Sequence, residues 1–461
     1  MAKIEQEILA REHPTVRDFE ARPFLPRRPA PDLGLARIDG ARFFDPAFMQ
    51  QEWQHIWTKT WQIVCRVAEF EAAGSFLVHE LGKESFLFVR GEDGEVRGFY
   101  NVCQHRGNRL CVAEQGELTH FTCPFHGWQW HTDGSLKKVA DPQFFRQFAN
   151  GVPADELALP RVRVDQWGGW LWFTMNDDAV DLRDYLGEFG RHLETYEFEK
   201  FSLIDYQTFE WNGNWKHAVD AFNESYHFAE LHPDMIEFGE GHDIPIEIEG
   251  IHSRMLNFNS TVSEVVPDRD TMTPLRASIM LAGGELPGYD GSAKDVHLAL
   301  MRARRAKEDS THLPYRRLND EQLVHQYHYT FFPNATFTQS AGAAFVFRYR
   351  PHATDPNRCY YDFFILANLP AGSPKRRVEH KVHPHTALHD YAEAFEGTFH
   401  PVFANVLAQD GSNMETMQAG VKSDSFKGML LSEQELRLRH FHQTIDAFIA
   451  GTVHANRPSG T

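Results

Sequence analysis

The chain has 461 residues, of which 42% are hydrophobic, and its formal net charge is −18. This length allows two or three domains with a full globular core. A strongly acidic chain without blocks of lysine and arginine is a poor candidate for binding nucleic acid. We also expect no membrane-spanning helix and no signal peptide, because no uninterrupted apolar run of about 18 residues occurs and the first residues are polar.

The first 40 residues are expected to form an N-terminal arm. Residues 1–20 look like a polar helix, and residues 22–34 contain four prolines, which favour an extended connector. Beyond the arm, Asp45 and Pro46 are a good helix start, since aspartate caps a helix and proline fits its first turn. The apolar residues that follow recur close to a 3.6-residue rhythm and predict an amphipathic helix with Phe48, Met49, Trp53, Ile56 and Trp57 on its buried side.

Residues 41–175 are expected to form a first domain that is mostly β. From Trp61 to Phe173 the pattern is one of short strands separated by glycine and aspartate turns. Hairpin-like turns are predicted at residues 91–94 and 133–134.

Two cysteines and two histidines stand out inside this β region. They form two short groups, Cys103-Gln-His105 and Cys123-Pro-Phe-His126. A tetrahedral zinc site accepts these ligands. A Rieske [2Fe–2S] cluster needs two thiolates on one iron and two imidazoles on the other. Each group pairs one Cys with one His, whereas a zinc finger usually pairs Cys with Cys, so the pairing favours the [2Fe–2S] cluster over zinc.

The remaining cysteines indicate where the protein resides. Cys65, Cys111 and Cys359 are an odd number with no disulfide pattern. Disulfides are rare in reducing compartments. We therefore expect a cytoplasmic protein.

Residues 176–461 are expected to form a second domain of helices and antiparallel strands. Residues 181–198 look helical, residues 326–369 alternate as antiparallel strands do, and residues 378–450 look mostly helical. Residues 265–325 mix proline, glycine and charged helical stretches, which predicts an excursion that covers a pocket.

This second domain contains a second set of metal-binding side chains. Asp220, Glu224 and His227 recur at i, i+4 and i+7, so a continuous helix would place them on one face. Pro233 disfavours helical backbone at His232, which we expect just beyond the helix end. Two histidines and one carboxylate leave open positions on iron, as in non-haem Fe(II) oxygenases, although zinc hydrolases use similar ligands.

The first metal-binding segment resembles the Rieske domain of ring-hydroxylating Rieske oxygenases. The resemblance is carried by residues 101–108, Asn-Val-Cys-Gln-His-Arg-Gly-Asn, and 123–128, Cys-Pro-Phe-His-Gly-Trp. Electron-transfer Rieske proteins carry an extra cysteine in each loop, where this chain has Asn108 and Phe125. The resemblance therefore implies the oxygenase branch, without the loop disulfide, and a cluster of lower potential.

The resemblance extends from about Arg42 to Phe448 and is weakest at residues 240–325. Asn214-Trp-Lys and the pattern acid-x-x-His-x-x-x-x-His match the family's second motif. The late stretch beginning Gln-Asp implies that Asp410 is the carboxylate ligand, with Glu415 as the runner-up. The resemblance thus implies three iron ligands, His227, His232 and Asp410.

The family also assigns a role to the acid before the first histidine, which is Glu224 here. By resemblance, Glu224 is a catalytic residue that links His126 or His105 of one subunit to His227 of its neighbour. The alternative is that Glu224 only supports His227 inside one subunit. The family's fold is α+β, with an N-terminal all-β Rieske domain and a C-terminal helix-grip-like catalytic domain of antiparallel sheet and covering helices.

The function implied by the resemblance is that of a terminal oxygenase. It would use O2 and electrons from NAD(P)H to cis-dihydroxylate or monohydroxylate an aromatic or other hydrophobic substrate. No GxGxxG or P-loop stretch occurs, so a separate reductase, with or without a ferredoxin, is expected to bind the nicotinamide. The family implies a homotrimer, or an α3β3 assembly with a small β subunit.

Three other functions remain open at this stage. The first is an oxidative demethylase or monooxygenase of an alkyl or quaternary ammonium compound, towards which Glu224 points by resemblance. A cationic substrate of this kind would favour an aromatic cage with carboxylates. The second is a pure Rieske electron carrier, which would need no mononuclear iron, and the third is a structural zinc protein.

Overall fold

The computed structural model describes residues 31–373, 378–385, 389–398 and 400–456. The expected polar helix over residues 1–20 and most of the proline-rich connector lie outside these residues. The chain divides into two compact units. One comprises Glu52–Tyr185, Pro351–Asp355 and residues 454–456, and the other comprises residues 31–51, Leu186–Arg350 and the described part of Pro356–Val453. The expected domain boundaries at residues 40 and 175 stay predictions.

The first unit is built on an antiparallel sheet, as its strand pattern predicts. Its seven strands lie in the order β1-β10-β9-β4-β3-β2-β5, and a smaller sheet has the order β6-β7-β8. The predicted turns at residues 91–94 and 133–134 join β3 to β4 and β7 to β8. The strands are β1 Gln62–Arg66, β2 Ser75–Leu81, β3 Glu84–Arg90, β4 Val96–Tyr100, β5 Gln115–Glu117, β6 Phe121–Thr122, β7 Gln129–Trp130, β8 Leu136–Lys138, β9 Arg161–Trp167 and β10 Trp170–Thr174.

An apolar core joins the two sheets of this unit. Side chains from β3, β4 and the small sheet pack together with the two cysteines of the metal-binding loops. Burial of these side chains fixes the loops against β3 and β4. The buried members are Leu87, Val89, Phe99, Cys103, Leu110, Phe121, Cys123, Trp128, Trp130, Val139 and Leu159.

The second unit is built on a nine-stranded sheet. The main order is β12-β14-β15-β16-β17-β18-β11-β19, and β13 pairs with β14. The antiparallel strands predicted over residues 326–369 are confirmed as β15 to β18. The strands are β11 Ser202–Trp211, β12 Gly239–Glu240, β13 Ile246–Glu249, β14 His252–Asn259, β15 Gln326–Phe331, β16 Ala335–Gln339, β17 Ala343–Pro351, β18 Cys359–Ala367 and β19 His380–His383.

The prediction that residues 378–450 are mostly helical is confirmed by α9 Tyr391–Ala394, α10 Pro401–Gly420 and α11 Leu436–Ile449, and strand β19 is the exception. It pairs in parallel with β11, with Tyr206 opposite His380 and Phe209 opposite His383. An unpaired sheet edge offers a row of backbone hydrogen-bond partners, and these override a weak local preference.

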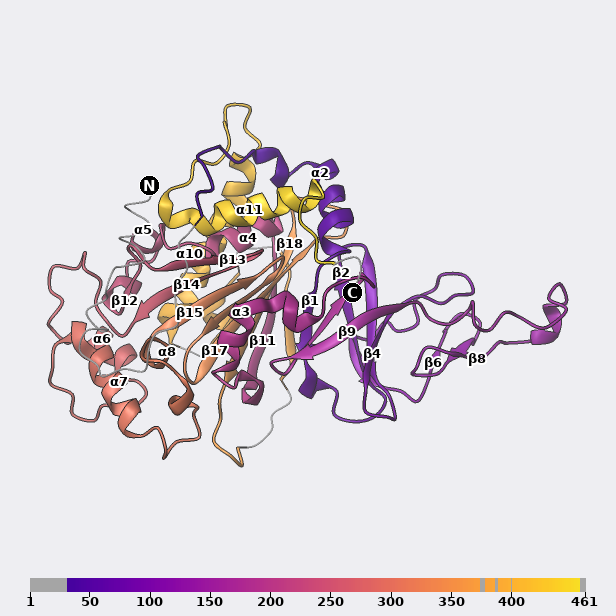
Figure 1. Cartoon of the computed structure of the whole chain (residues 1–461), viewed down its shortest axis with the longest axis horizontal. Helices are drawn as coiled ribbons and strands as arrows, with labels where there is room; N and C mark the ends of the chain where they lie inside the picture. Colours follow the sequence, from indigo (N-terminus) through magenta and orange to yellow (C-terminus); the bar gives the residue numbers. More distant parts are fainter. Residues whose placement is uncertain (1–30, 374–377, 386–388, 399, 457–461) are drawn as a thin grey trace. The chain divides into compact units, whose positions relative to one another are not determined.

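Helices α4, α10 and α11 lie near one another beside this sheet (Figure 1). Phe222 of α4 stacks on Phe347 of β17 and on Tyr361 of β18, which identifies the sheet face that α4 covers. The α-helices are α2 Pro46–Glu52, α3 Leu182–Glu194, α4 Trp215–Phe222, α5 Phe228–Leu231, α6 Pro274–Met280, α7 Val296–Ala306, α8 Asp320–Val324, α9 Tyr391–Ala394, α10 Pro401–Gly420 and α11 Leu436–Ile449.

Short helical turns complete the fold. The predicted helix start at Asp45 is confirmed, because its carboxylate accepts from the Ala47 N–H at 2.8 Å and α2 begins at Pro46. A π-helix continues α2 over Trp53–Trp57. The 3-10 helices are Gly40–Phe43, Val67–Glu69, Pro142–Phe144, Phe198–Lys200, Met235–Glu237, Ala293–Asp295, Tyr315–Arg317 and Glu433–Glu435.

The excursion over residues 265–325 consists of α6, α7, α8 and connecting turns. It lines a cavity of about 480 Å³, bordered by an ion pair between Arg304 and Glu285. That the excursion covers the reaction site stays a prediction. Among the described residues, no helix combines the length and apolarity needed to cross a membrane.

Candidate metal centres

The two loops that carry the cysteines and the first two histidines share one backbone design. The N–H of Cys103 donates to the carbonyl of Asn108 at 2.7 Å, and the N–H of Cys123 donates to the carbonyl of Trp128 at 2.8 Å. Four residues after each cysteine, a glycine N–H donates back to the cysteine carbonyl at 3.0 Å. These glycines, Gly107 and Gly127, have φ of +76° and +72°, a conformation that favours glycine.

The side chains of these loops fit an iron–sulfur cluster. The imidazole rings of His105 and His126 lie 4.7 Å apart between centroids, and the Nδ1 atom of each is buried without a hydrogen-bond partner. A buried polar atom without a partner is costly, so two such atoms in neighbouring rings indicate an absent ligand. The Cys103 and Cys123 thiols contact each other beside them. Two sulfurs and two imidazole nitrogens are the donors that a Rieske cluster requires.

The electrostatics of the loops favour the ligating forms of His105 and Cys123, whereas burial raises the pKa of Cys103 and favours its thiol. Burial, with the nearby His126 and Arg106, lowers the pKa of His105 and keeps its ring neutral. Burial opposes the thiolate of Cys123, but the backbone N–H groups of Phe125 and His126 donate to its sulfur and lower its pKa. Backbone donors to sulfur also tune the potential of a bound cluster.

Two residues that are not themselves candidate cluster ligands hold the loops in place. The amide of Asn101 accepts from the N–H groups of Leu110 and Cys111 and donates to the carbonyl of Cys111, which closes the first loop at its base. Trp128 stacks on His105, with 4.5 Å between ring centroids. Sequence reasoning assigned no role to Asn101, although it opens the motif.

The prediction of one helix through Asp220, Glu224 and His227 is wrong. Helix α4 ends at Phe222, and His227 is the N-cap of the separate four-residue helix α5. The cause is local, since the Glu224 carboxylate accepts from the N–H groups of Tyr226 and His227 and so competes with helical hydrogen bonds. His232 is the C-cap of α5, so it does lie just beyond a helix end.

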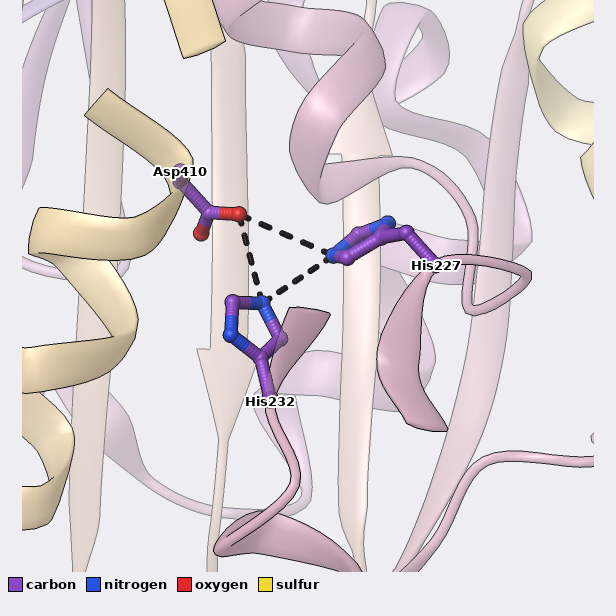
Figure 2. A group of neighbouring side chains, drawn as sticks. All are labelled: His227, His232 and Asp410. Carbon is purple, nitrogen blue, oxygen red and sulfur yellow. Dashed lines mark hydrogen bonds and ion pairs between the residues drawn. The ribbon is translucent and has the colours of Figure 1, made fainter. Parts of the chain in front are cut away.

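His227, His232 and Asp410 nevertheless meet at one point (Figure 2). The Nε2 atoms of the two histidines are 3.1 Å apart, and the Asp410 Oδ1 atom is 3.2 Å from His232 Nε2 and 3.7 Å from His227 Nε2. Ligands about 2.1 Å from one ion and at right angles to each other are about 3 Å apart. The three atoms therefore fit as ligands on one face of an ion, and the remaining coordination positions of that ion are not filled by these residues.

Each histidine is oriented by an acceptor on its other nitrogen. His227 Nδ1–H donates to Glu224, and His232 Nδ1–H donates to Gln409 Oε1 at 2.8 Å. Both Nε2 atoms then keep their lone pairs for a metal. Burial lowers the pKa of His227, but the hydrogen bond to Glu224 and the charge of Asp410 raise it on balance. Sequence reasoning gave Gln409 no role, although it directly precedes Asp410.

Helix α10 brings Asp410 to this site, whereas the runner-up Glu415 is exposed on the same helix. A buried amide network fixes α10 against α4. Gln418 accepts from the Asn214 N–H at 2.8 Å and donates to the carbonyl of Phe43 at 3.0 Å. Asn214 is the N-cap of α4 and also donates to the carbonyl of Pro356 at 2.7 Å.

The chain matches the family described as "Ring hydroxylating alpha subunit (catalytic domain)" over residues 198–451 and that of the "Rieske [2Fe-2S] domain" over residues 60–149. The chain therefore belongs to the ring-hydroxylating α-subunit family. This membership confirms the resemblance inferred from the motifs and the expected fold class of Rieske domain plus catalytic domain.

Curated relatives of the chain include both monooxygenases and dioxygenases. It is 30% identical over 197 residues to a glycine betaine monooxygenase oxygenase subunit of Pseudomonas aeruginosa, covering 42% of this chain and 44% of that protein. It is 31% identical to the biphenyl 2,3-dioxygenase α subunit of Rhodococcus jostii over 201 residues, covering 42% and 43%. The carnitine monooxygenase oxygenase subunit of Escherichia coli is 32% identical over 196 residues, covering 42% and 51%. The chain thus spans about half the length of the curated relatives that it matches.

Solved structures share the fold along almost the whole chain. A quaternary ammonium Rieske monooxygenase in complex with L-carnitine aligns with a TM-score of 0.61 at 17% identity, covering 92% of this chain and 99% of the other. Naphthalene 1,2-dioxygenase with indole bound aligns with a TM-score of 0.64 at 19% identity, covering 91% and 93%. At these identities the likeness concerns the fold alone.

Proposed function

We propose that this protein is the terminal oxygenase component of a Rieske non-haem iron system. The observation that carries the proposal is the pair of donor sets in one chain. One set has two sulfurs and two unpartnered imidazole nitrogens, and the other has two histidines and Asp410 whose ligand atoms all lie within 4.8 Å of one another. When bound, the [2Fe–2S] cluster stores and passes electrons, and the mononuclear Fe(II) uses them to react with O2.

The side chains of the second site hold protons and orient ligands. Glu224 and Gln409 keep the Nδ1 protons of His227 and His232, so that both Nε2 atoms face the ion. Asp410 is 3% exposed and brings one negative charge into a buried site. That charge would offset part of the charge of a bound Fe(II) ion and so reduce the cost of holding the ion in a buried site.

Glu224 is proposed to connect the two centres in an assembled trimer. Its carboxylate accepts from His227 within the subunit and has acceptor capacity left for an imidazole N–H of a neighbour's cluster loop, from His105 or His126. A carboxylate between two imidazoles would orient both rings and couple their redox states. The alternative, support of His227 alone, predicts no effect of Glu224 on electron transfer between subunits.

The substrate is proposed to be an aromatic or other hydrophobic molecule, hydroxylated once or twice. Phe222, Phe347 and Tyr361 stack on the sheet face beside α4. The second candidate is oxidation of a quaternary ammonium compound. It is favoured by Glu224, which by resemblance occurs in that branch, and by the glycine betaine and carnitine monooxygenases among the relatives.

The electrons are proposed to come from NAD(P)H through a separate cytoplasmic reductase, with or without a ferredoxin. A homotrimer, or an α3β3 assembly with a small β subunit, would bring each cluster to a neighbour's iron. The reductase, the ferredoxin and the small β subunit are inferred from the family resemblance.

The deciding experiment is metal analysis of the anaerobically purified protein, followed by turnover with a surrogate reductase. About three irons and two sulfides per chain, with a red-brown Rieske spectrum, are expected. Substrate-dependent consumption of O2 should follow with an aromatic acid or a betaine. A colourless protein with stoichiometric zinc would overturn the proposal, and a cluster without iron binding at the second site would indicate an electron carrier.

A further inference from the structure

Tyr391 of α9 lies against the middle of α10, at Gly411, the residue that follows the proposed iron ligand Asp410. A Cβ atom added at Gly411 would lie 2.6 Å from the Tyr391 hydroxyl oxygen and 3.2 Å from the ring carbon that carries it. The helix therefore approaches this phenol more closely than a residue with a Cβ allows. Glycine inside a helix lowers stability relative to alanine, so the close approach gives a reason for glycine at this position.

The Tyr391 phenol is held by the sheet. Its hydroxyl accepts a hydrogen bond from the Trp211 Nε1–H at 2.8 Å, and its ring packs against Phe209 with 4.7 Å between centroids. Trp211 and Phe209 both belong to β11, and Trp211 stacks on Tyr361 of β18 with 4.4 Å between centroids. Tyr391 and Trp211 are both buried. The phenol therefore links α10 to two strands of the sheet.

Three consecutive residues of α10 make contacts in three directions, since successive positions of a helix are rotated by about 100°. Gln409 accepts from His232 Nδ1–H at 2.8 Å. The Asp410 Oδ1 atom lies 3.2 Å from His232 Nε2. Gly411 meets Tyr391. Because His232 belongs to a separate segment at the end of α5, a small shift of α10 would change both contacts of this histidine at once.

We propose that the contact between Tyr391 and Gly411 sets the position of Asp410 in the second metal centre. Tyr391 is thus a positioning residue, which acts on the metal ligands through α10. This inference rests on the proposed oxygenase function, since it assigns a role at the iron site of that function. Metal–ligand distances tolerate changes of only about 0.2 Å. Relief of a contact at 2.6 Å needs a larger shift, because carbon atoms in ordinary contact are about 3.5–4 Å apart.

The alternative is that the phenol only packs against α10 and can move without consequence for the metal site. Tyr391 lines a cavity of about 350 Å³ together with Ala404 and Ala408 of α10, so the ring has space to move. Such a movement would break the hydrogen bond from Trp211 and leave a buried N–H group without an acceptor, which is costly. This hydrogen bond therefore favours a displacement of α10 over a displacement of the ring.

The test measures the binding of Co(II) to anaerobic protein that retains its oxidised cluster and has been stripped of mononuclear iron. The electron paramagnetic resonance spectrum of bound Co(II) reports its coordination geometry, and the oxidised cluster gives no such signal. We expect Gly411→Ala to weaken Co(II) binding about tenfold or more and to change this spectrum. The matched control is Gly420→Ala, at the end of the same helix, where an added Cβ meets nothing within 4 Å. It should bind Co(II) as the wild type does.

A second variant removes the hydroxyl that the added methyl group would strike. In Gly411→Ala/Tyr391→Phe the nearest ring atom is 3.2 Å from the added Cβ, so a much smaller shift relieves the contact. We expect the double variant to bind Co(II) with an affinity within about threefold of Tyr391→Phe alone, which is a non-additive effect of two residues in contact. A loss of affinity caused by lower stability would not be recovered in this way, because Tyr391→Phe also deprives Trp211 of its acceptor.

Three outcomes would overturn the positioning role and leave the proposed function in place. They are the same Co(II) affinity and spectrum in Gly411→Ala as in the wild type, an equal loss in Gly420→Ala, or no recovery in the double variant. Should Gly411→Ala not fold, Tyr391→Leu takes its place, because it removes the phenol that Gly411 meets, and an unchanged Co(II) spectrum in that variant would refute the role. A wild-type protein that binds no Co(II) would refute the proposed iron site itself, and the inference with it.

Discussion

The two candidate metal centres are built in opposite ways. The four cluster ligands come from two neighbouring loops, each closed by its own backbone hydrogen bonds around Cys103 and Cys123. The second centre joins His232 to residues of α10 far away in the sequence, since its partner Gln409 lies 177 positions later. The first centre is therefore specified by local sequence, and the second depends on how distant elements pack.

This difference predicts where each centre is vulnerable. The cluster loops depend on turn geometry, which Gly107 and Gly127 provide at positive φ, and on the closing amide of Asn101. The histidine–aspartate site depends on supports that carry no metal ligand, such as the Gln418–Asn214 contact between α10 and α4. Substitutions that remove one centre and leave the other intact are the most direct test of this difference between the centres.

The largest expected effect is the loss of one centre without the other. Asp410→Ala should remove the mononuclear iron and leave the cluster spectrum unchanged, because it deletes one of the three iron ligands and none of the cluster ligands. Cys103→Ala should do the reverse. Turnover should fall about a thousandfold or more in both variants, since each centre supplies a separate part of the chemistry. Iron and sulfide analysis with visible spectra checks both predictions.

The control for this pair is Glu415→Ala, which removes an exposed carboxylate from α10. It should retain both centres. Loss of the cluster in Asp410→Ala, or loss of the second iron in Glu415→Ala, would show that the ligands are assigned incorrectly.

The next largest effect concerns the link between the centres. Glu224→Gln keeps an acceptor for His227 Nδ1–H but removes the charge that would bind a second imidazole. We expect iron content to stay near normal and oxidation of the reduced cluster, in the presence of substrate and O2, to slow about tenfold to a hundredfold. Stopped-flow absorbance of the cluster in single turnover measures this rate. An unchanged rate would leave Glu224 as a support of His227 alone.

The cluster ligands could be proposed from sequence because a fixed short spacing determines their chemistry. Each cysteine and histidine lies within one turn, so no long-range packing had to be known. The hairpin turns and the strands β15 to β18 followed from local alternation in the same way. Asp410, by contrast, could be identified as the carboxylate ligand only from the family resemblance. No pattern near His232 indicates a ligand so far away in the sequence.

The failures of sequence reasoning have physical causes that can be named. The i, i+4, i+7 spacing of Asp220, Glu224 and His227 predicts one helix, but the Glu224 carboxylate captures two backbone N–H groups and divides it. Asp220 instead accepts from His442 of α11 at 3.0 Å and is not part of the group formed by His227, His232 and Asp410. Strand β19 forms because β11 has an open edge, which is a property of the sheet and not of residues 380–383.

The third prediction tests the support of His232. Gln409→Leu removes the acceptor from His232 Nδ1–H and allows the other tautomer, whose Nε2–H cannot bind a metal. We expect the affinity for Fe(II) to fall about tenfold, whereas the cluster spectrum stays unchanged. Gln409→Glu restores an acceptor and should recover most of the affinity. Titration of the iron-stripped protein with Fe(II) measures both values, and equal affinities in the wild type and Gln409→Leu would refute the role.

The smallest effect compares two helix caps. Asn214 caps α4, and Asn319 caps α8 inside the excursion. Substitution of either residue by alanine should lower the free energy of unfolding by about 1 kcal/mol. Asn214→Ala should have the larger effect of the two, because it also leaves the buried carbonyl of Pro356 without its donor.

Only Asn214→Ala should also weaken Fe(II) binding, because α4 leads into Glu224 and His227 and the substitution removes the side-chain cap at the start of α4. The cluster loops share none of these contacts, so the cluster spectrum should be the same in both variants. Chemical denaturation followed by circular dichroism, together with Fe(II) titration, separates stability from metal binding. An equal loss of Fe(II) affinity in both variants would mean that the second centre responds to global stability. A loss confined to Asn214→Ala would mean that the second centre depends on the capped start of α4.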